Sequence, residues 1–376
     1  MNSVAAEDSQ VSAVILDLDG TLLNTEQLTK EVLKDLLARY GKVVDEEKAR
    51  MILGMSIEHS RHAIIKDYDL PITAEKFIQE IRPMYQQKWL LAQPLPGADR
   101  LIKHLHRHKV PFALASNSRT VSVESKISNQ PGWKNYFLIL LGSDQVKSGK
   151  PAPDIFLEAA KRMSVDATRC LVVEDSLIGV QAAKAARMKV VAIPSLQIEY
   201  DQFSVADMVL HSLLELRPEL WGLPSFEDWV NDALPIEPIY MKGLYRNGLL
   251  HELTGFYREG LSVLPDQVAG IYFGWAKIES PVIFKILIRI SWNVVDGGSI
   301  KKIIHVSTVE GNEQVHDQRM LISLVGFIRG LSSKGNMLDG KEMVEEDKIT
   351  ARTALDSLAF TNHSCIPLFS QVAFTD

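Results

Sequence analysis

The sequence has little cysteine: only Cys170 and Cys365 among 376 residues. Two cysteines so far apart exclude the disulfide framework of small secreted proteins and favour a reducing compartment, so we expect a cytoplasmic protein. The first residues, 1–9, have neither a basic region nor an apolar core and therefore do not resemble a signal peptide.

Long apolar runs and basic tracts are also missing. The most apolar stretch, Val282 to Ile290, is interrupted by Lys285 and Arg289, whereas a membrane helix needs roughly 18 apolar residues in a row. We therefore expect no membrane partner. The formal net charge is -6, and without clustered lysine and arginine a nucleic acid is not expected as the main partner. The remaining composition, 46% hydrophobic and 23% charged, is that of a globular protein, and the length predicts two or three domains.

The first part of the chain alternates between short apolar segments and helical patterns. Residues 11–17 predict a buried strand, and residues 26–92 have apolar positions at helical spacing. Pro83 lies within this helical region and is expected to kink or end a helix. After residue 93 the alternation of helix and strand is typical of a parallel sheet with right-handed crossovers. We expect an α/β core, a Rossmann-like parallel sheet, at residues 11–25 and 93–220, and a helical cap at residues 26–92.

Beyond Pro235 the pattern changes to apolar segments separated by turn residues. A helical pattern closes this region at residues 342–355. We expect residues 235–376 to form a second, β-rich and barrel-like domain. Its predicted strands are residues 271–276, 282–292, 303–308 and 321–328.

Polar and charged side chains follow the predicted strands of the first domain. Asp17 and Asp19 end the first strand, and ligands of parallel α/β sheets bind at the carboxyl ends of the strands. Further candidates follow later strands or precede a helix: Ser116, Asn117, Lys150, Glu174 and Asp175.

These residue types fit the hydrolysis of a phosphate ester. Carboxylates such as Asp17, Glu174 and Asp175 are hard oxygen ligands suited to Mg²⁺. A carboxylate is also a covalent nucleophile in aspartyl-phosphate chemistry, which makes Asp17 the candidate nucleophile. A magnesium ion and Lys150 would offset the negative charge of the phosphoryl group.

The remaining steps have candidates in the same set. Asp19 is the candidate general acid for the leaving oxygen and then the general base for water. Ser116 is a candidate ligand for a phosphoryl oxygen, although a serine after a strand is also a common helix cap.

Three other patterns have simpler interpretations. Asp17-x-Asp19-Gly20 lacks the later glutamate of a calcium loop. His104, His106 and His108 have no cysteine or acidic partner nearby in sequence, so we interpret them as a solvated helix face rather than a zinc site. The cap aromatics Tyr68, Tyr85 and Trp89 fit ordinary packing better than stacking on a flat substrate.

In order, Asp17-x-Asp19-Gly-Thr, Ser116-Asn117, Lys150 and Glu174-Asp175 resemble the four motifs of the haloacid-dehalogenase superfamily, in its magnesium-dependent phosphatase branch. The resemblance implies that the first aspartate is phosphorylated, that the second is the acid/base and a backbone ligand of magnesium, and that the last pair completes the metal site. We expect catalytic roles for Asp17, Asp19, Ser116 and Lys150, substrate binding by Thr21, Ser116, Asn117 and Lys150, and Mg²⁺ binding by Asp17, Asp19, Glu174 and Asp175.

A narrower resemblance covers residues 12–240. The segments beginning at Gly142, Gly149 and Val173 look like the phosphatase half of the plant bifunctional riboflavin kinase/FMN hydrolase family. This resemblance implies hydrolysis of FMN to riboflavin, fused to a six-stranded riboflavin kinase barrel that uses riboflavin and ATP.

The C-terminal region keeps the framework of such a kinase at residues 270–276, 291–293 and 325–329, but departs from its functional motifs. Residues 243–257 lack the Pro-Thr-Ala-Asn whose Thr and Asn serve magnesium–ATP in the family. Near Ile304-His305, where a glutamate followed by proline is the family's base, there is neither residue; a shifted register would bring in Glu310. We expect a barrel that folds but phosphorylates poorly or not at all.

Two alternatives stay open. As an alternative, the same motifs would serve a phosphatase or phosphomutase acting on another small ester, such as a sugar phosphate or a nucleotide. The C-terminal domain would then be a non-catalytic flavin-binding or interaction module. Haloacid dehalogenation itself is not expected, because Asp19 and the metal carboxylates would have no part in it.

Overall fold

The computed structural model describes residues 10–45, 48–49, 52, 55, 57–194, 200–256, 264–278, 283–294, 300–310, 318–331 and 343–361. The chain divides into two compact units. The first comprises Met1–Val209 and Arg217–Ser225, and the second Leu210–Leu216 and Phe226–Asp376. Cys365 lies outside the described residues.

The centre of the first unit is a parallel sheet of six strands, in the order β3-β2-β1-β4-β5-β6. The parallel α/β core expected from the sequence is therefore confirmed. Strand β1 pairs with β2 on one side and β4 on the other, so the direction of the strand order changes beside β1, where ligands bind in open α/β sheets. The strands are β1 (Ala13–Leu16), β2 (Phe112–Ala115), β3 (Ile139–Leu141), β4 (Cys170–Glu174), β5 (Lys189–Ala192) and β6 (Met208–Val209).

Helices pack on this sheet through their apolar faces. In α8, Ile155, Phe156 and Ala159 are fully buried and share a core with Ile15 of β1 and Val172 of β4. This spacing of buried positions is that of an amphipathic helix on a sheet. The core helices are α5 (Ala98–Arg107), α6 (Thr120–Ile127), α7 (Trp133–Tyr136), α8 (Asp154–Met163) and α9 (Leu177–Ala185).

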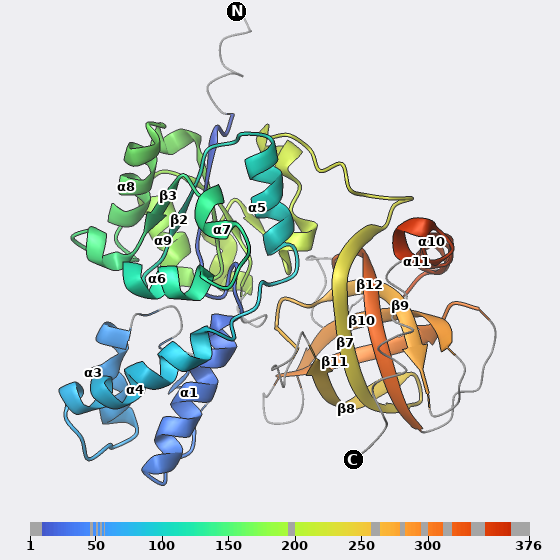
Figure 1. The fold of residues 1–376 in the computed structure, drawn as a ribbon, viewed down its shortest axis with the longest axis horizontal. Coiled ribbons are helices and arrows are strands. Elements are labelled where there is room, and N and C mark those ends of the chain that lie inside the picture. Colours follow the sequence, from blue (N-terminus) through green and yellow to red (C-terminus); the bar gives the residue numbers. More distant parts are fainter. Residues whose placement is uncertain are drawn as a thin grey trace, which may run out of the picture. The chain divides into compact units, whose positions relative to one another are not determined.

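Three further helices form the cap: α1 (Thr25–Arg39), α3 (Ile57–Asp67) and α4 (Ala74–Trp89) (Figure 1). They enclose an apolar core of their own, to which α4 contributes Phe77, Ile81 and Tyr85. Helix α4 does not end at Pro83, so that part of the expectation is wrong. The buried stripe of α4 continues across the proline, and this packing outweighs the lost hydrogen bond.

Two segments of the chain connect the cap to the core, and hydrogen bonds join these two segments. Asn24 and Gln93 exchange two hydrogen bonds, from Gln93 N to Asn24 Oδ1 at 2.9 Å and from Asn24 N to Gln93 O at 3.1 Å. Leu23 and Pro94 form an antiparallel bridge beside them. The exact limits of cap and core, at residues 26 and 92, stay a prediction.

The second unit is a closed antiparallel barrel in the order β10-β11-β8-β7-β12-β9 (Figure 1). Four strands were expected from the sequence, whereas β7 and β8 were not. Pro235 and Pro238 lie near the start of β7, opposite the point where its pairing with β12 shifts register, and strands tolerate proline at such positions. The strands are β7 (Leu234–Arg246), β8 (Leu249–Phe256), β9 (Gly270–Lys277), β10 (Ile283–Val294), β11 (Ile300–Thr308) and β12 (Gln318–Arg329).

Helix α10 (Glu345–Leu355) packs against this barrel and is followed by α11 (Leu358–Thr361). Ala351, Ala354 and Leu355 join the apolar core that includes Phe273 of β9. Two hydrogen bonds, of 2.9 and 2.8 Å, connect the Arg329 guanidinium to the Asp347 carboxylate. The predicted closing helix is thus confirmed, beginning three residues later than expected.

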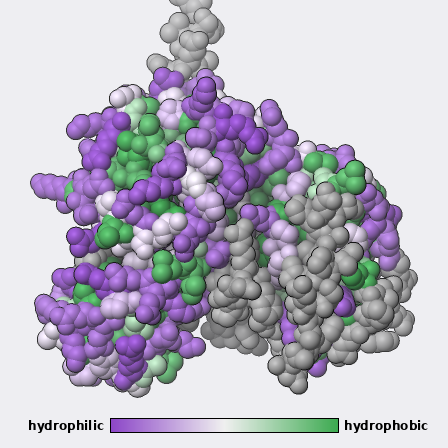
Figure 2. Space-filling model, in the orientation of Figure 1, coloured by the Kyte–Doolittle hydropathy of each residue, from purple (hydrophilic) through white to green (hydrophobic). Residues whose placement is uncertain are grey.

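Within the described part of the chain, no helix is both long and apolar enough to cross a membrane. On the face drawn in Figure 2, hydrophilic side chains predominate over the cap and the α/β core. Large apolar side chains fill the interior of each unit, among them Trp133, Phe156 and Tyr272.

Candidate active site

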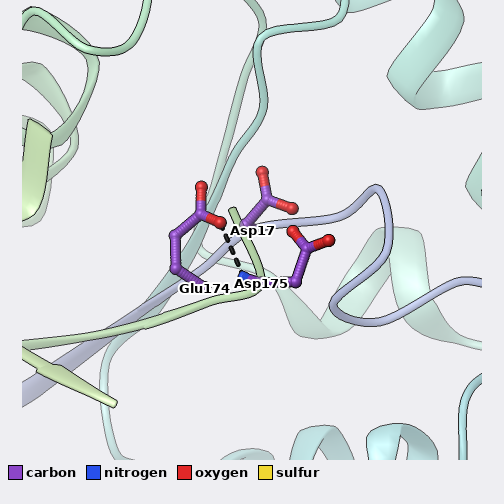
Figure 3. Close-up of side chains that lie close together, drawn as sticks. All are labelled: Asp17, Glu174 and Asp175. Carbon is purple, nitrogen blue, oxygen red and sulfur yellow. Dashed lines mark hydrogen bonds between the residues drawn. The ribbon is translucent and has the colours of Figure 1, made fainter. Parts of the chain in front are cut away.

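Three buried carboxylates meet at the carboxyl ends of β1 and β4 (Figure 3). Asp17 directly follows β1, Glu174 is the last residue of β4, and Asp175 comes next. One oxygen of each lies within 4.8 Å of the others. Three oxygen ligands so close together fit a hard divalent cation such as Mg²⁺.

Lys150 lies between two of these carboxylates. Its Nζ is 2.6 Å from Asp17 Oδ1 and 2.6 Å from Glu174 Oε1, with only 2% of the side chain exposed. Burial by itself would lower the pKa of Lys150, but the two carboxylates raise it above its usual value. Burial raises the pKa of Asp17 to about 7, with Glu174 and Asp19 adding to the rise and Lys150 opposing it.

The backbone of Lys150 is fixed by Asn117. Lys150 N donates to Asn117 Oδ1 at 2.8 Å, and Asn117 Nδ2 donates to Lys150 O at 3.3 Å. The structure thus gives Asn117 a place in orienting Lys150; contact with the substrate, which the sequence analysis expected, stays a prediction.

Glu174 is fixed by the start of helix α9. Its Oε2 accepts hydrogen bonds from Asp175 N at 2.7 Å, Ser176 N at 2.9 Å and Ser176 Oγ at 3.1 Å. Gly179 leaves the room for this carboxylate, because a Cβ there would lie only 1.7 Å from Glu174 Oε1. Glu174 therefore has little freedom to turn away from Lys150.

The carboxylate of Asp19 is separate from that cluster and has its own set of donors. Oδ1 accepts from Thr25 Oγ1 at 2.7 Å and from Lys126 Nζ at 2.5 Å. Oδ2 accepts from Ser116 Oγ at 3.0 Å and from Ser118 Oγ at 2.9 Å. Burial would raise the pKa of Asp19, but Lys126 and the hydroxyl donors together lower it below its usual value.

Thr21 belongs to the same neighbourhood, since Thr21 Oγ1 donates to Asp175 Oδ1 at 3.2 Å. All the residues singled out from the sequence thus lie at this edge of the sheet. Their roles in binding metal and substrate, including a metal contact of Asp19, stay predictions.

Sequence reasoning missed Lys126, Ser118 and Thr25. Ser118 and Thr25 are near the motifs that were noticed, but Lys126 lies ten residues after Ser116, in a helix that was not predicted. No sequence signal near Lys126 indicates that its side chain meets Asp19.

The site opens into a cavity of about 270 Å³ lined by both core and cap. Its cap wall includes apolar and aromatic side chains, among them Ile81, Tyr85 and Trp89. The rings of Tyr85 and Trp89 stack, with centroids 5.2 Å apart and an angle of 11° between their planes. Tyr68 lies in the interior of the cap, as packing requires.

The solvated helix face expected for the histidines at the end of α5 is wrong for His104, which is 7% exposed. His104 Nε2 lies 2.8 Å from Pro224 O, and the His104 ring is 4.4 Å from the ring of His108, which follows α5. Among the described residues, the cluster that could hold a metal ion is that of Asp17, Glu174 and Asp175.

The chain is similar to known hydrolases in sequence and in fold. The profile of the haloacid dehalogenase-like hydrolases matches residues 14–193. A crystal structure of a haloacid dehalogenase family hydrolase from Deinococcus radiodurans, with bound phosphate and sodium, is 25% identical with a TM-score of 0.50; the match covers 58% of this chain and 100% of that one.

Two curated relatives come from Arabidopsis thaliana. The (DL)-glycerol-3-phosphatase 1 is 40% identical over 58% of this chain and 76% of its own length. The bifunctional riboflavin kinase/FMN phosphatase is 39% identical over 92% of this chain and 93% of its own length, so the likeness extends through both units. The chain therefore belongs to the haloacid dehalogenase-like hydrolases, in the same family as the Arabidopsis bifunctional riboflavin kinase/FMN phosphatase.

Proposed function

We propose that the first unit is a magnesium-dependent phosphatase that hydrolyses FMN to riboflavin and phosphate. The observation that carries the proposal is the placement of Asp17, within 2.6 Å of the buried Lys150 ammonium and beside Glu174 and Asp175. The likeness to the Arabidopsis riboflavin kinase/FMN phosphatase over 92% of this chain supports the choice of substrate.

In this proposal Asp17, Glu174 and Asp175 would hold Mg²⁺, together with the backbone of Asp19. The bound ion would supply positive charge for the phosphoryl oxygens. The fit rests on the donor set, which consists of carboxylate oxygens within 4.8 Å of one another.

Hydrolysis then takes two steps on the residues of this chain. A carboxylate oxygen of Asp17 forms a bond to phosphorus while the bond to the ester oxygen breaks, and Asp19 gives that oxygen a proton. Water next attacks the phosphorus of phospho-Asp17 while Asp19 takes a proton from the water. The bond between phosphorus and the Asp17 oxygen breaks, which releases phosphate and restores the Asp17 carboxylate. Lys150 offsets the phosphoryl charge in both steps. The proposal also gives Ser116, which lines the cavity, and Thr21, which donates to Asp175, contacts with phosphoryl oxygens.

The cavity supports a substrate with a flat apolar part. Tyr85 and Trp89 form a stacked aromatic wall beside Ile81. The same cavity also includes Glu26, Lys30 and Arg82, which would suit a small polar ester. This second observation, with the glycerol-3-phosphatase relative, favours the alternative of a sugar or polyol phosphate.

For the second unit we propose a riboflavin kinase-like barrel with weak or no kinase activity. Ile304 and His305, where the base of such kinases would be expected, lie within β11 and are not acidic. Glu310 follows β11, and its carboxylate accepts a hydrogen bond from Lys285 Nζ at 2.8 Å. Tyr257, at the end of the expected nucleotide-binding segment, lies outside the described residues. We also propose a cytoplasmic location, which the low cysteine content favours.

The test is an assay in both directions with the full chain. With Mg²⁺ and FMN we expect equal amounts of riboflavin and phosphate, and no release after chelation of the metal. With riboflavin and magnesium–ATP we expect little or no FMN. Phosphate release from glycerol 3-phosphate but not from FMN would contradict the proposed substrate in favour of the alternative.

Replacing Gly20 by alanine is expected to lower phosphatase activity by about 100-fold, because misplacing a catalytic group by about 1 Å has effects of this size. Gly20 has a φ of 82°, and a Cβ there would lie 2.1 Å from Asp175 Oδ2. Asp175 must then move, so more Mg²⁺ should be needed for half-maximal rate. Phosphate release as a function of Mg²⁺ concentration measures both effects.

Gly41→Ala is the matched control for this prediction. Gly41 also has a positive φ, 68°, but a Cβ there would have no neighbour within 4 Å. The control variant should share the backbone strain and keep the activity of the wild type. Equal losses in the two variants would show that strain, and not Asp175, is responsible.

A further inference from the structure

A second buried lysine, Lys126, contacts the proposed acid/base. Its side chain is 3% exposed, and Nζ donates to Asp19 Oδ1 at 2.5 Å and to Ser118 Oγ at 2.9 Å. Ser118 in turn donates to the other oxygen of Asp19. Lys126 thus touches Asp19 both directly and through a hydroxyl group.

The Lys126 ammonium also contacts the cap. Nζ lies 4.3 Å from the centroid of the Trp89 ring, a cation–π contact that is stronger when water is excluded. Trp89 is the last residue of α4 in the cap, and its ring stacks on Tyr85 of the same helix. Lys126 therefore lies between a cap side chain and the acid/base of the core.

The surrounding chain fixes this arrangement. Lys126 occupies the last turn of α6, where Val123 and Ile127 are buried in the core. Just beyond α6, Asn129 Nδ2 donates to Leu90 O at 2.8 Å and Gln130 Nε2 donates to Ala92 O at 3.0 Å. The end of α6 is therefore bonded to the segment that immediately follows Trp89.

We propose that Lys126 is a positioning residue of the phosphatase reaction. The lysine fixes the orientation of the Asp19 carboxylate and is itself held by the Trp89 ring of the cap. Among the described residues, each oxygen of Asp19 has two side-chain donors, Lys126 and Thr25 for Oδ1, Ser116 and Ser118 for Oδ2. Without the lysine, Asp19 Oδ1 would keep the neutral Thr25 hydroxyl as its donor. The carboxylate would lose its charge-assisted hydrogen bond, which is stronger than one from a neutral donor. This inference rests on the proposed function, in which Asp19 gives and takes a proton.

The effect of losing Lys126 should depend on the leaving group of the ester. The ester oxygen of FMN would leave as an unstable alkoxide without a proton from Asp19, whereas 4-nitrophenolate is stable enough to leave without one. Misorienting Asp19 should therefore slow the first cleavage of FMN but not that of 4-nitrophenyl phosphate. The second step, attack of water on phospho-Asp17, should slow with either ester.

The experiment is rapid mixing of the full chain, with Mg²⁺ and saturating ester, for wild type and Lys126→Met. We expect riboflavin release in a single turnover to fall by about 10- to 100-fold. The first turnover of 4-nitrophenolate should keep the wild-type rate, while its steady-state turnover falls. A purely structural role would lower both first-turnover rates alike, and that result, or no change in either, would overturn the proposal.

Two further variants keep the test decisive. Trp89→Leu should give the same pattern with a smaller loss, and adding it to Lys126→Met should cause no further loss in riboflavin release. Additive losses would show that Trp89 does not act through Lys126. Lys88→Met is the control: Lys88 neighbours Trp89 and pairs with Glu31 at 2.8 Å, so its loss should leave all these rates unchanged.

The outcome also separates this inference from the proposed function. A wild-type protein that hydrolyses neither FMN nor glycerol 3-phosphate would refute the proposed function and this inference with it. A wild type that hydrolyses FMN, with a Lys126→Met variant of equal rates, would refute the positioning role alone.

Discussion

Asp17→Asn is expected to lower phosphate release from FMN by about 10⁴-fold or more, because it removes the proposed nucleophile. An amide oxygen does not form the covalent bond to phosphorus that a carboxylate forms. The substitution preserves the size of the side chain in a site where Asp17 is 5% exposed. Phosphate release in steady state measures the loss, and acid quenching followed by mass spectrometry should find a phosphorylated protein for the wild type alone.

A matched control for this prediction is Asp35→Asn. Asp35 is an exposed aspartate of α1 in the cap and does not line the cavity. The Asp35→Asn variant should keep the activity of the wild type. If Asp17→Asn retained its activity, or still formed a phosphorylated protein, the nucleophile would be another residue.

The strand-end residues of the first unit could be predicted from the sequence because their spacing follows elementary geometry. A short apolar run that ends in Asp17 is a buried parallel strand, and parallel strands bring their carboxyl ends to one edge. Glu174 and Asp175 follow a second such run, which proved to be the neighbouring strand. At these residues the apolar pattern of the sequence was therefore enough to predict the position in the sheet.

The environment of Asp19 could not be predicted in the same way. Lys126 is 107 residues away in sequence, and only the folded chain brings the two side chains together. Helix α6 is eight residues long, too short for its apolar spacing to be distinctive. Contacts of this kind depend on rotamers and packing, which a single sequence does not display.

The barrel shows a different limit. Strands such as β9 are mostly buried and were visible as apolar runs. Strand β7 alternates between buried and partly exposed positions and has two prolines near its start. Its composition therefore did not indicate a strand. Closure of the barrel depends on the pairing of β8 with both β7 and β11, which composition does not reveal.

The two aspartates of the first motif, although two residues apart, have different partners. Asp17 is paired with Lys150 and belongs to the carboxylate cluster, whereas Asp19 is paired with Lys126 among hydroxyl groups. Their pKa values move in opposite directions, that of Asp17 upward through burial and that of Asp19 downward through Lys126 and its hydroxyl donors. Different environments for two adjacent carboxyl groups are typical of sites that use them for different tasks.

Lys150→Met is expected to lower phosphatase activity by about 10²- to 10³-fold even at saturating Mg²⁺, since a charge that stabilises the transition state is lost. Lys147→Met is the matched control: Lys147 is exposed in the same loop and should be replaceable without loss. Phosphate release from FMN measures both. Similar losses in both variants would indicate that the loop, and not the Lys150 ammonium, is responsible.

The same substitution should also alter stability in a manner that depends on the metal. Lys150 is the cation bonded to Asp17 and Glu174, whose side chains are only 6% and 0% exposed. Removing Lys150 therefore leaves the charges of these two carboxylates uncompensated. Losing one partner of such a buried group costs about 3–5 kcal/mol of unfolding free energy. Because Mg²⁺ would bind only the folded site, adding it should raise the melting temperature of Lys150→Met more than that of the wild type. An equal rise in both proteins would show that the ion does not take over the charge of Lys150, and would argue against Asp17 and Glu174 as its ligands.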